Sequence, residues 1–198
     1  MEFALIFIAV MGFVATNLDD MFVLMIFFAH SDYKNTQIII GQYIGISSLI
    51  LISTLGYFFK FIIPTAWIGL LGIFPVIIGL KNLLELRKNN KNDDTSPKIK
   101  NRRFISRFIN SSIFSVAIVS FINGGDNIGV YTPLFATLDL YQLYFVILIF
   151  LIMIGVWCFI SHRLVNNMRL GGRIRKYGHL ILPFVLILIG ISILIQTV

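Results

Sequence analysis

Two short acidic motifs lie within long apolar stretches of the sequence. Residues 16–29 align without a gap on residues 123–136, and Asp19 then falls on Asp126. A carboxylate inside a membrane-spanning segment is costly and by default marks a functional site. Two matched acids, one in each half of a small chain, therefore predict a single site built where two repeats meet, as in many transporters.

Each motif carries polar side chains whose spacing places them on one face of a helix, because residues three and four positions apart are neighbours there. The candidate ligands are Thr16, Asp19 and Asp20 in the first motif and Asn123, Asp126 and Asn127 in the second. Such oxygen ligands favour hard divalent metals such as Mn²⁺ or Mg²⁺. Asn17 is a weaker candidate, as is the carbonyl of Gly129, which Pro133 deprives of its helical donor.

The charge of these motifs indicates what the site would hold. Several ionised carboxylates buried together would be too costly without a counter-charge, and no basic residue is close to them in sequence. A divalent cation would neutralise most of the charge, and a proton held by one Asp is the alternative. If the cation and the proton occupy the site alternately, the protein exchanges metal for protons. Hydrogen bonding between helices would account for a single buried Asp or Asn, but less well for two equivalent sets.

The composition predicts an all-α polytopic membrane protein. Of the 198 residues, 58% are hydrophobic and 13% charged, whereas about a quarter of a soluble domain is charged. Six spans of roughly 20 residues or more are expected, at residues 3–29, 38–60, 64–84, 105–136, 142–162 and 178–197. The first and fourth exceed the required length and should be tilted or broken, and Gly12 in the first and Gly129 with Pro133 in the fourth are available to help. Pro75 and Pro183 should kink the third and sixth.

The chain divides into two halves around a polar segment. We expect a first three-helix repeat at 1–84, a basic cytoplasmic linker at 85–104 and a second three-helix repeat at 105–198. An odd number of spans in each half inverts the second repeat relative to the first. Each acid is then about 15 Å from its end of the span, at about 1.5 Å per residue, so Asp19 and Asp126 should meet near the midplane.

The distribution of basic residues predicts the orientation of the chain. They gather in the linker and in the loop between the fifth and sixth spans, so both loops should be cytoplasmic and both termini outside. The net charge of +7 therefore reflects membrane orientation, and nucleic acid is not an expected partner. The expected partners are a divalent metal ion and the lipid bilayer, and a small-residue face at Gly41 and Gly45 permits a homodimer.

Three segments together resemble one family of membrane proteins. They are residues 15–20, the Gly-Gln-Tyr-Ile-Gly run at residues 41–45, and residues 123–131. They are similar to the cadmium resistance transporter (Cad) family of the lysine-exporter superfamily, over nearly the whole chain. The resemblance implies a secondary transporter that exports Cd²⁺, with Zn²⁺ as a further candidate, across a bacterial plasma membrane. It implies a protein that is not an enzyme and needs no cofactor, with the metal as its cargo.

Two other functions fit the same acids. In an intramembrane aspartyl protease, Asp19 and Asp126 would form the catalytic dyad, but Asp20 and Asn127 would then have no role. In a cation channel, the acids would form the selectivity filter. An exporter of another cation is a further alternative. Sulfur ligands from Met21, Met25 or Cys158 are less expected than packing roles for these residues.

Overall fold

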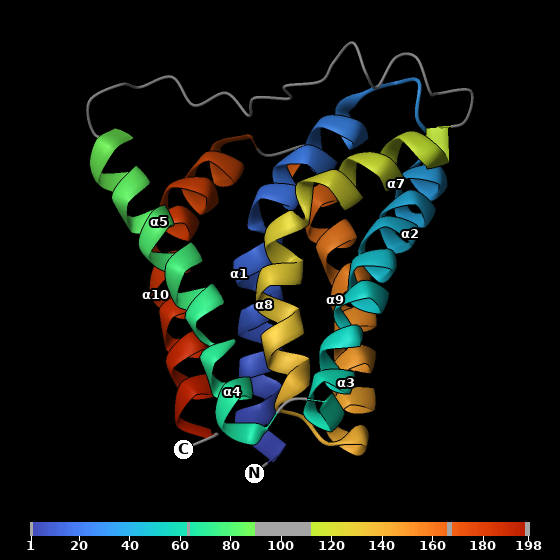
Figure 1. Cartoon of the computed structure of the whole chain (residues 1–198). Coiled ribbons are helices and arrows are strands. Elements are labelled where there is room, and N and C mark those ends of the chain that lie inside the picture. Colours follow the sequence, from blue (N-terminus) through green and yellow to red (C-terminus); the bar gives the residue numbers. More distant parts are fainter. Residues whose placement is uncertain (1, 63, 90–111, 166–167, 197–198) are drawn as a thin grey trace.

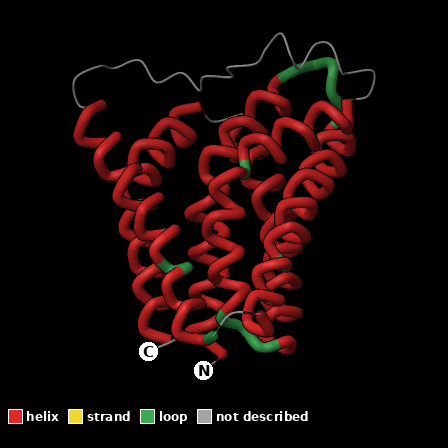
Figure 2. The backbone as a smooth tube through the Cα atoms, in the orientation of Figure 1, coloured by secondary structure: helices red, strands yellow, loops and turns green. Residues whose placement is uncertain are grey.

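The computed structural model describes residues 2–62, 64–89, 112–165 and 168–196, and all of the secondary structure in these ranges is helical. Most of the predicted linker at 85–104 and the beginning of the predicted second repeat, up to residue 111, lie outside the described residues. Figure 2 shows helices joined by short loops in the described part. The predicted all-α class is therefore confirmed for these ranges.

The first half begins with a continuous helix, α1 (Glu2–Ala29), so the long first span is not broken. The second span is interrupted at Thr54, which separates α2 (Asn35–Ser53) from α3 (Leu55–Ile62). The third consists of α4 (Thr65–Leu70) and α5 (Ile73–Asn89). Here the interruption precedes Pro75, which lies in the first turn of α5, where proline is tolerated.

The second half begins with the broken helix that its length predicted, although the break lies elsewhere. α7 (Ser112–Asn123) and α8 (Gly125–Ala136) meet at Gly124 with a bend of 64°. Pro133 lies inside α8, so the break falls at the glycine pair of the motif and not at Gly129 or Pro133. α9 (Leu140–Val165) and α10 (Met168–Gln196) follow, and α10 contains Pro183.

Length and apolar composition identify candidate membrane spans among the described residues. Four helical segments qualify: Phe3–Ala29, Asn35–Ile62, Trp67–Leu84 and Leu140–Val165. The bent pair α7–α8 would be a fifth span if it crosses as one unit, and Leu180–Ile195 is a shorter apolar helix. Large apolar side chains are exposed on several of these helices, as expected of a surface that faces lipid.

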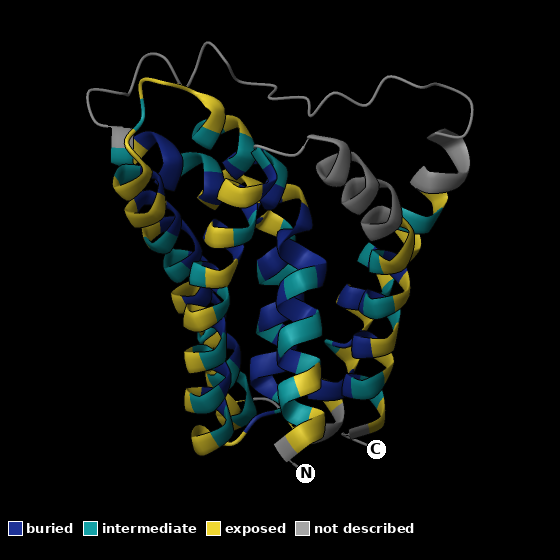
Figure 3. Cartoon of the chain, turned by 180° about the vertical axis from the view of Figure 1, so that it is seen from behind, coloured by how far each residue is buried: buried dark blue, intermediate teal, exposed yellow. Residues whose placement is uncertain are grey.

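The most extensive helix contacts join elements of different halves. α2 packs along α7, α1 along α9, and α5 along α10. Figure 1 shows that α1 begins and α10 ends at one end of the bundle, whereas α5 ends and α7 begins at the other. Figure 3 shows that the buried residues of α1 gather in its middle, away from the exposed first turns near the N-terminus.

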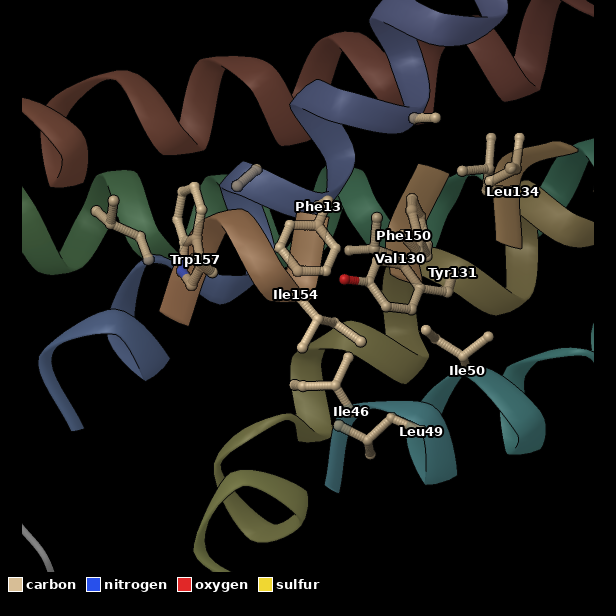
Figure 4. Packing of buried hydrophobic residues seen from close by; sticks show 14 of the residues in the cluster. Phe13, Ile46, Leu49, Ile50, Val130, Tyr131, Leu134, Phe150, Ile154 and Trp157 are labelled. Atoms are coloured by element: carbon tan, nitrogen blue, oxygen red, sulfur yellow. The ribbon is translucent and has the colours of Figure 1, made fainter. Parts of the chain in front are cut away.

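Aromatic side chains fill the centre of the bundle beside the acidic motifs. The ring centroids of Tyr131 and Phe150 are 4.6 Å apart, and those of Phe13 and Phe150 are 5.6 Å apart. Figure 4 shows this packing of α1, α8 and α9. Trp157 extends the cluster along α9, with its ring nearly perpendicular to that of Phe13 at a centroid distance of 5.8 Å. This core holds the middle of α1 against α8 and thereby positions both motifs.

Candidate functional site

The first motif lies in the middle of α1, on the helix face that points into the bundle. Thr16, Asn17 and Asp20 are buried, whereas Asp19 is exposed. Successive helical residues point in directions about 100° apart at 3.6 residues per turn. Asp19 and Asp20 therefore cannot share the same surroundings, and Asp20 is the acid that faces the interior.

The second motif lies where the fourth span bends. Asn123 ends α7 and is exposed, Asp126 is half-buried in the first turn of α8, and Asn127 is buried. The break at Gly124 is tightly packed, because a Cβ added there would collide with the Leu49 side chain. On the two sides of this bend, Asn127 is buried and Asn123 is exposed.

Hydrogen bonds connect the two motifs through Tyr131. Its hydroxyl lies 2.9 Å from Thr16 Oγ1 and accepts a hydrogen bond of 2.7 Å from Asn17 Nδ2. The side chain of Asn127 donates to Asn17 Oδ1 at 3.1 Å. Trp157 of α9 donates its indole N–H to the backbone carbonyl of Asn17 at 2.7 Å. Polar groups of α1, α8 and α9 therefore form one network.

A second set of hydrogen bonds holds Asp20. Gln42 of α2 donates from Nε2 to Asp20 Oδ2, and Ser120 of α7 donates from its hydroxyl to Gln42 Oε1. The side chain of Asn123 also lies close to the Asp20 carboxylate. Gln42 of α2, itself held by Ser120 of α7, thus fixes one carboxylate oxygen of a side chain that is only 2% exposed.

Two buried oxygens in this region have no hydrogen-bond partner. They are Asp20 Oδ1 and Asn127 Oδ1. Asp20 and Asn127 also fall on one another in the alignment of the two motifs. Buried polar atoms are normally satisfied, so two unsatisfied acceptors at equivalent positions indicate a place for a ligand that accepts electron pairs. A cation has this chemistry.

The acids are close enough to influence one another. Asp126 lies within electrostatic range of Asp19 and of Asp20. In the described part of the chain, however, no group of three or more His, Cys, Asp or Glu side chains is arranged to hold a metal ion. A cation here would be held by few carboxylates together with amide and hydroxyl oxygens. Such a set suits a cargo that must be released more than a permanent structural ion.

The six predicted ligands therefore have different surroundings. Thr16, Asp20 and Asn127 are buried, Asp126 is half-buried beside them, and Asp19 and Asn123 are exposed. Met21 is buried and Met25 packs against the apolar core, as expected for packing residues. Cys158 is buried on α9 and lies within electrostatic range of Asp20.

The sequence analysis did not assign several residues of the two networks to the site. Tyr131 is four residues after Asn127, and Ser120 is three before Asn123, so helical spacing could have indicated both. Gln42 and Tyr131 both lie in segments that carry the family resemblance, and Gln42 was considered only as a residue that could line an inner vestibule. No spacing or motif in the sequence indicates Trp157, because its contact depends on how α9 packs against α1.

The comparisons with known proteins agree with the motif resemblance. The sequence model described as cadmium resistance transporter (Cad) matches residues 13–198, which include both motifs and nearly the whole chain. No curated protein and no solved structure matches the chain.

Proposed function

The chain belongs to the cadmium resistance transporter family, and from this we propose that it exports Cd²⁺ from the cytoplasm through a site made by its two acidic motifs. The observation that carries the proposal is the pair of equivalent buried oxygens, Asp20 Oδ1 and Asn127 Oδ1, that have no hydrogen-bond partner. Family membership supports cadmium transport, and the oxygens support the location of the site.

In this proposal, Asp20 and Asn127 provide the inner ligands and Asp126 adds charge at the edge of the site. Thr16 and Asn123 lie beside them, and Asp19 contributes through its charge, since it is within electrostatic range of Asp126. In the absence of the cation, a proton would compensate negative charge that these acids place inside the bundle. Binding of a cation would displace that proton, so an opposing proton gradient would drive release of the metal.

We further propose six spans arranged as two inverted three-helix repeats, with repeats at 1–84 and 105–198. The packing of α5 against α10 supports this arrangement. A Cβ on Gly79 would lie 2.7 Å from the carbonyl oxygen of Pro183, and one on Gly190 would lie 2.6 Å from that of Gly72. Gly79 and Gly190 are also equivalent when the third and sixth spans are aligned. In an inverted repeat, equivalent helices run in opposite directions, so close contacts at equivalent glycines of α5 and α10 support the arrangement.

The proposed location is a bacterial plasma membrane, with both termini outside and the linker in the cytoplasm. The arrangement of helix ends supports termini on one side, because α1 begins and α10 ends at the same end of the bundle. The excess of Lys and Arg in the linker supports a cytoplasmic position for the opposite end. Reporter tags at each terminus test the orientation, and a cytoplasmic signal from either tag would contradict it.

The family is one of transporters, which agrees with a protein that is not an enzyme. No observation favours the protease or the channel hypothesis. Zn²⁺ is proposed as a second cargo, because it carries the same charge as Cd²⁺ and also binds carboxylate oxygens. Competition by Zn²⁺ for Cd²⁺ transport measures this directly.

The test is accumulation of radioactive Cd²⁺ in metal-sensitive bacteria that express the wild type or single variants at matched membrane levels. We expect low accumulation with the wild type and high accumulation with Asp20→Asn or Asp126→Asn. The matched control is Asp32→Asn, since the Asp32 side chain is 76% exposed and lies after the end of α1. Equal accumulation in all strains would reject Cd²⁺ export, and export by the Asp20 variant would reject the site.

A further inference from the structure

Gln42 is a buried amide on α2, only 1% exposed, that the acidic motifs do not include. Its helix lies unusually close to α7. A Cβ on Gly41 would lie 2.6 Å from the carbonyl oxygen of Ile113, and one on Gly45 would lie 2.8 Å from Ser120 Cβ. The two glycines flank Gln42 along α2, so the close approach holds its side chain between α1 and α7.

Both polar atoms of the Gln42 amide form hydrogen bonds, and the amide has one orientation that allows both. A carboxylate that binds a cation is ionised and can only accept hydrogen bonds, so in the metal-bound state the amide must turn Nε2 toward Asp20 Oδ2, which is the orientation seen here. Its Oε1 then faces Ser120, whose hydroxyl donates to it. A chain of donors therefore runs from Ser120 through Gln42 to Asp20, across three helices.

As a result, the two carboxylate oxygens of Asp20 have different surroundings. Oδ2 accepts from Gln42, whereas Oδ1 is buried without a partner. If the carboxylate were free to rotate, either oxygen could turn away from the site. The bond from Gln42 prevents this rotation and keeps Oδ1 available.

We propose that Gln42 is the positioning residue of the transport site: held by Ser120, it orients Asp20 so that Oδ1 binds the divalent cation. This inference rests on the proposed function, because it assigns a residue that prepares the same site for its cargo. Residues that orient a metal ligand typically change metal affinity about 10- to 100-fold when they are replaced. Their loss should weaken binding more than it slows the later steps of transport.

The experiment measures Cd²⁺ uptake into inside-out membrane vesicles as a function of Cd²⁺ concentration. Gln42→Met keeps nearly the same side-chain volume but removes both hydrogen bonds. We expect it to raise KM for Cd²⁺ about 10- to 100-fold, with a maximal rate per transporter near that of the wild type. Gln37→Met is the matched control, since Gln37 lies in the first turn of the same helix, where its side-chain oxygen accepts a hydrogen bond from the local backbone amide of Lys34.

A second pair of variants separates orientation from packing. Ser120→Ala alone should raise KM by about threefold, the effect of one neutral hydrogen bond. In the Gln42→Met background, Ser120→Ala should not raise KM further, because the bond to Oε1 is already absent. Independent packing effects of the two substitutions would instead be additive. Ser48→Ala, whose hydroxyl bonds the Ile44 carbonyl of its own helix at 2.7 Å, should be silent in both backgrounds.

The outcomes distinguish failure of the proposed function from failure of the positioning role of Gln42. If the wild type takes up no Cd²⁺, the proposed function fails. If the wild type transports and Asp20→Asn does not, but Gln42→Met keeps the wild-type KM, only the positioning role is rejected. A lower maximal rate with unchanged KM, or additive effects of the two substitutions, would also reject it and make Gln42 a packing residue.

Discussion

The hydroxyl of Tyr131 lies 2.9 Å from Thr16 Oγ1, which joins the two acidic motifs although the residues are 115 positions apart. The same hydroxyl accepts from Asn17 Nδ2 at 2.7 Å. A single tyrosine oxygen thus fixes the relative position of α1 and α8 in the middle of the bundle. Several consequences of this and neighbouring contacts can be measured.

Tyr131→Phe should destabilise the protein by about 1 kcal/mol, because it leaves buried polar partners with one bond fewer. For a chain of this size that corresponds to a fall of about 2–4 °C in the midpoint of thermal unfolding. The midpoint is measured on purified protein in detergent. Tyr144→Phe is the control, since Tyr144 is 69% exposed; an equal fall for both variants would mean that the central hydroxyl has no special role.

Gly45→Ala should impair both folding and Cd²⁺ transport. The added methyl group would lie 2.8 Å from the Ala117 carbonyl oxygen and from Ser120 Cβ, so α2 and α7 must separate. Overpacking of this kind costs about 1–3 kcal/mol. Membrane yield, unfolding midpoint and vesicle uptake together measure the effect.

Gly12→Ala provides the matched control for that substitution. Its methyl group would meet only Ile189 Cδ1, at 3.5 Å, which is an ordinary contact. It should leave yield and uptake close to those of the wild type. A tolerated Gly45→Ala would contradict the close packing of α2 on α7.

Cys158→Ala should retain Cd²⁺ transport with a nearly unchanged KM, since the proposed ligands are oxygens. Cys158 is buried on α9, so a small loss of stability is expected from the space its sulfur leaves. Uptake measured over a range of Cd²⁺ concentrations separates the two effects. A large rise in KM without loss of folded protein would add the thiolate to the ligand set.

Lys60→Met should weaken the contact between the end of α3 and the segment that follows α8. Lys60 Nζ donates to the Leu138 carbonyl at 2.9 Å and lies 3.9 Å from the centroid of the Tyr57 ring. Together these interactions contribute about 1 kcal/mol, which thermal unfolding in detergent will detect. Asp139→Asn should be nearly silent, because Asp139 is 88% exposed and its 4.0 Å ion pair with Lys60 contributes little.

The helical architecture could be predicted from apolar length, but the breaks could not be located by proline alone. The predicted span at 3–29 is nearly α1, and the predicted span at 142–162 lies within α9. The break in the fourth span falls at Gly124 and not near Pro133, because Pro133 lies within α8 as a helical residue. The adjacent glycines of the motif, which have no side chain to pack, allow the sharper change of direction.

Within the site, the alignment identified the right segments but could not tell which acid faces inward. Asp19 and Asp20 are equally consistent with a face shared with Thr16, at three and four residues. The packing of α1 on α8 and α9 selects Asp20, and the same packing brings Asn127 inward. Gln42 and Trp157 belong to the networks only because α2 and α9 lie against α1, and such long-range contacts are not encoded in local spacing.

The pairing of α2 with α7, α1 with α9 and α5 with α10 has a consequence for biosynthesis. The first half emerges from the ribosome before its principal partners exist, so Asp20 and Gln42 must enter the bilayer without Ser120, Tyr131 or Trp157. Tertiary structure can therefore form only after the second half has been inserted. Two separately expressed halves should acquire protease resistance only when they are made together in the same membrane.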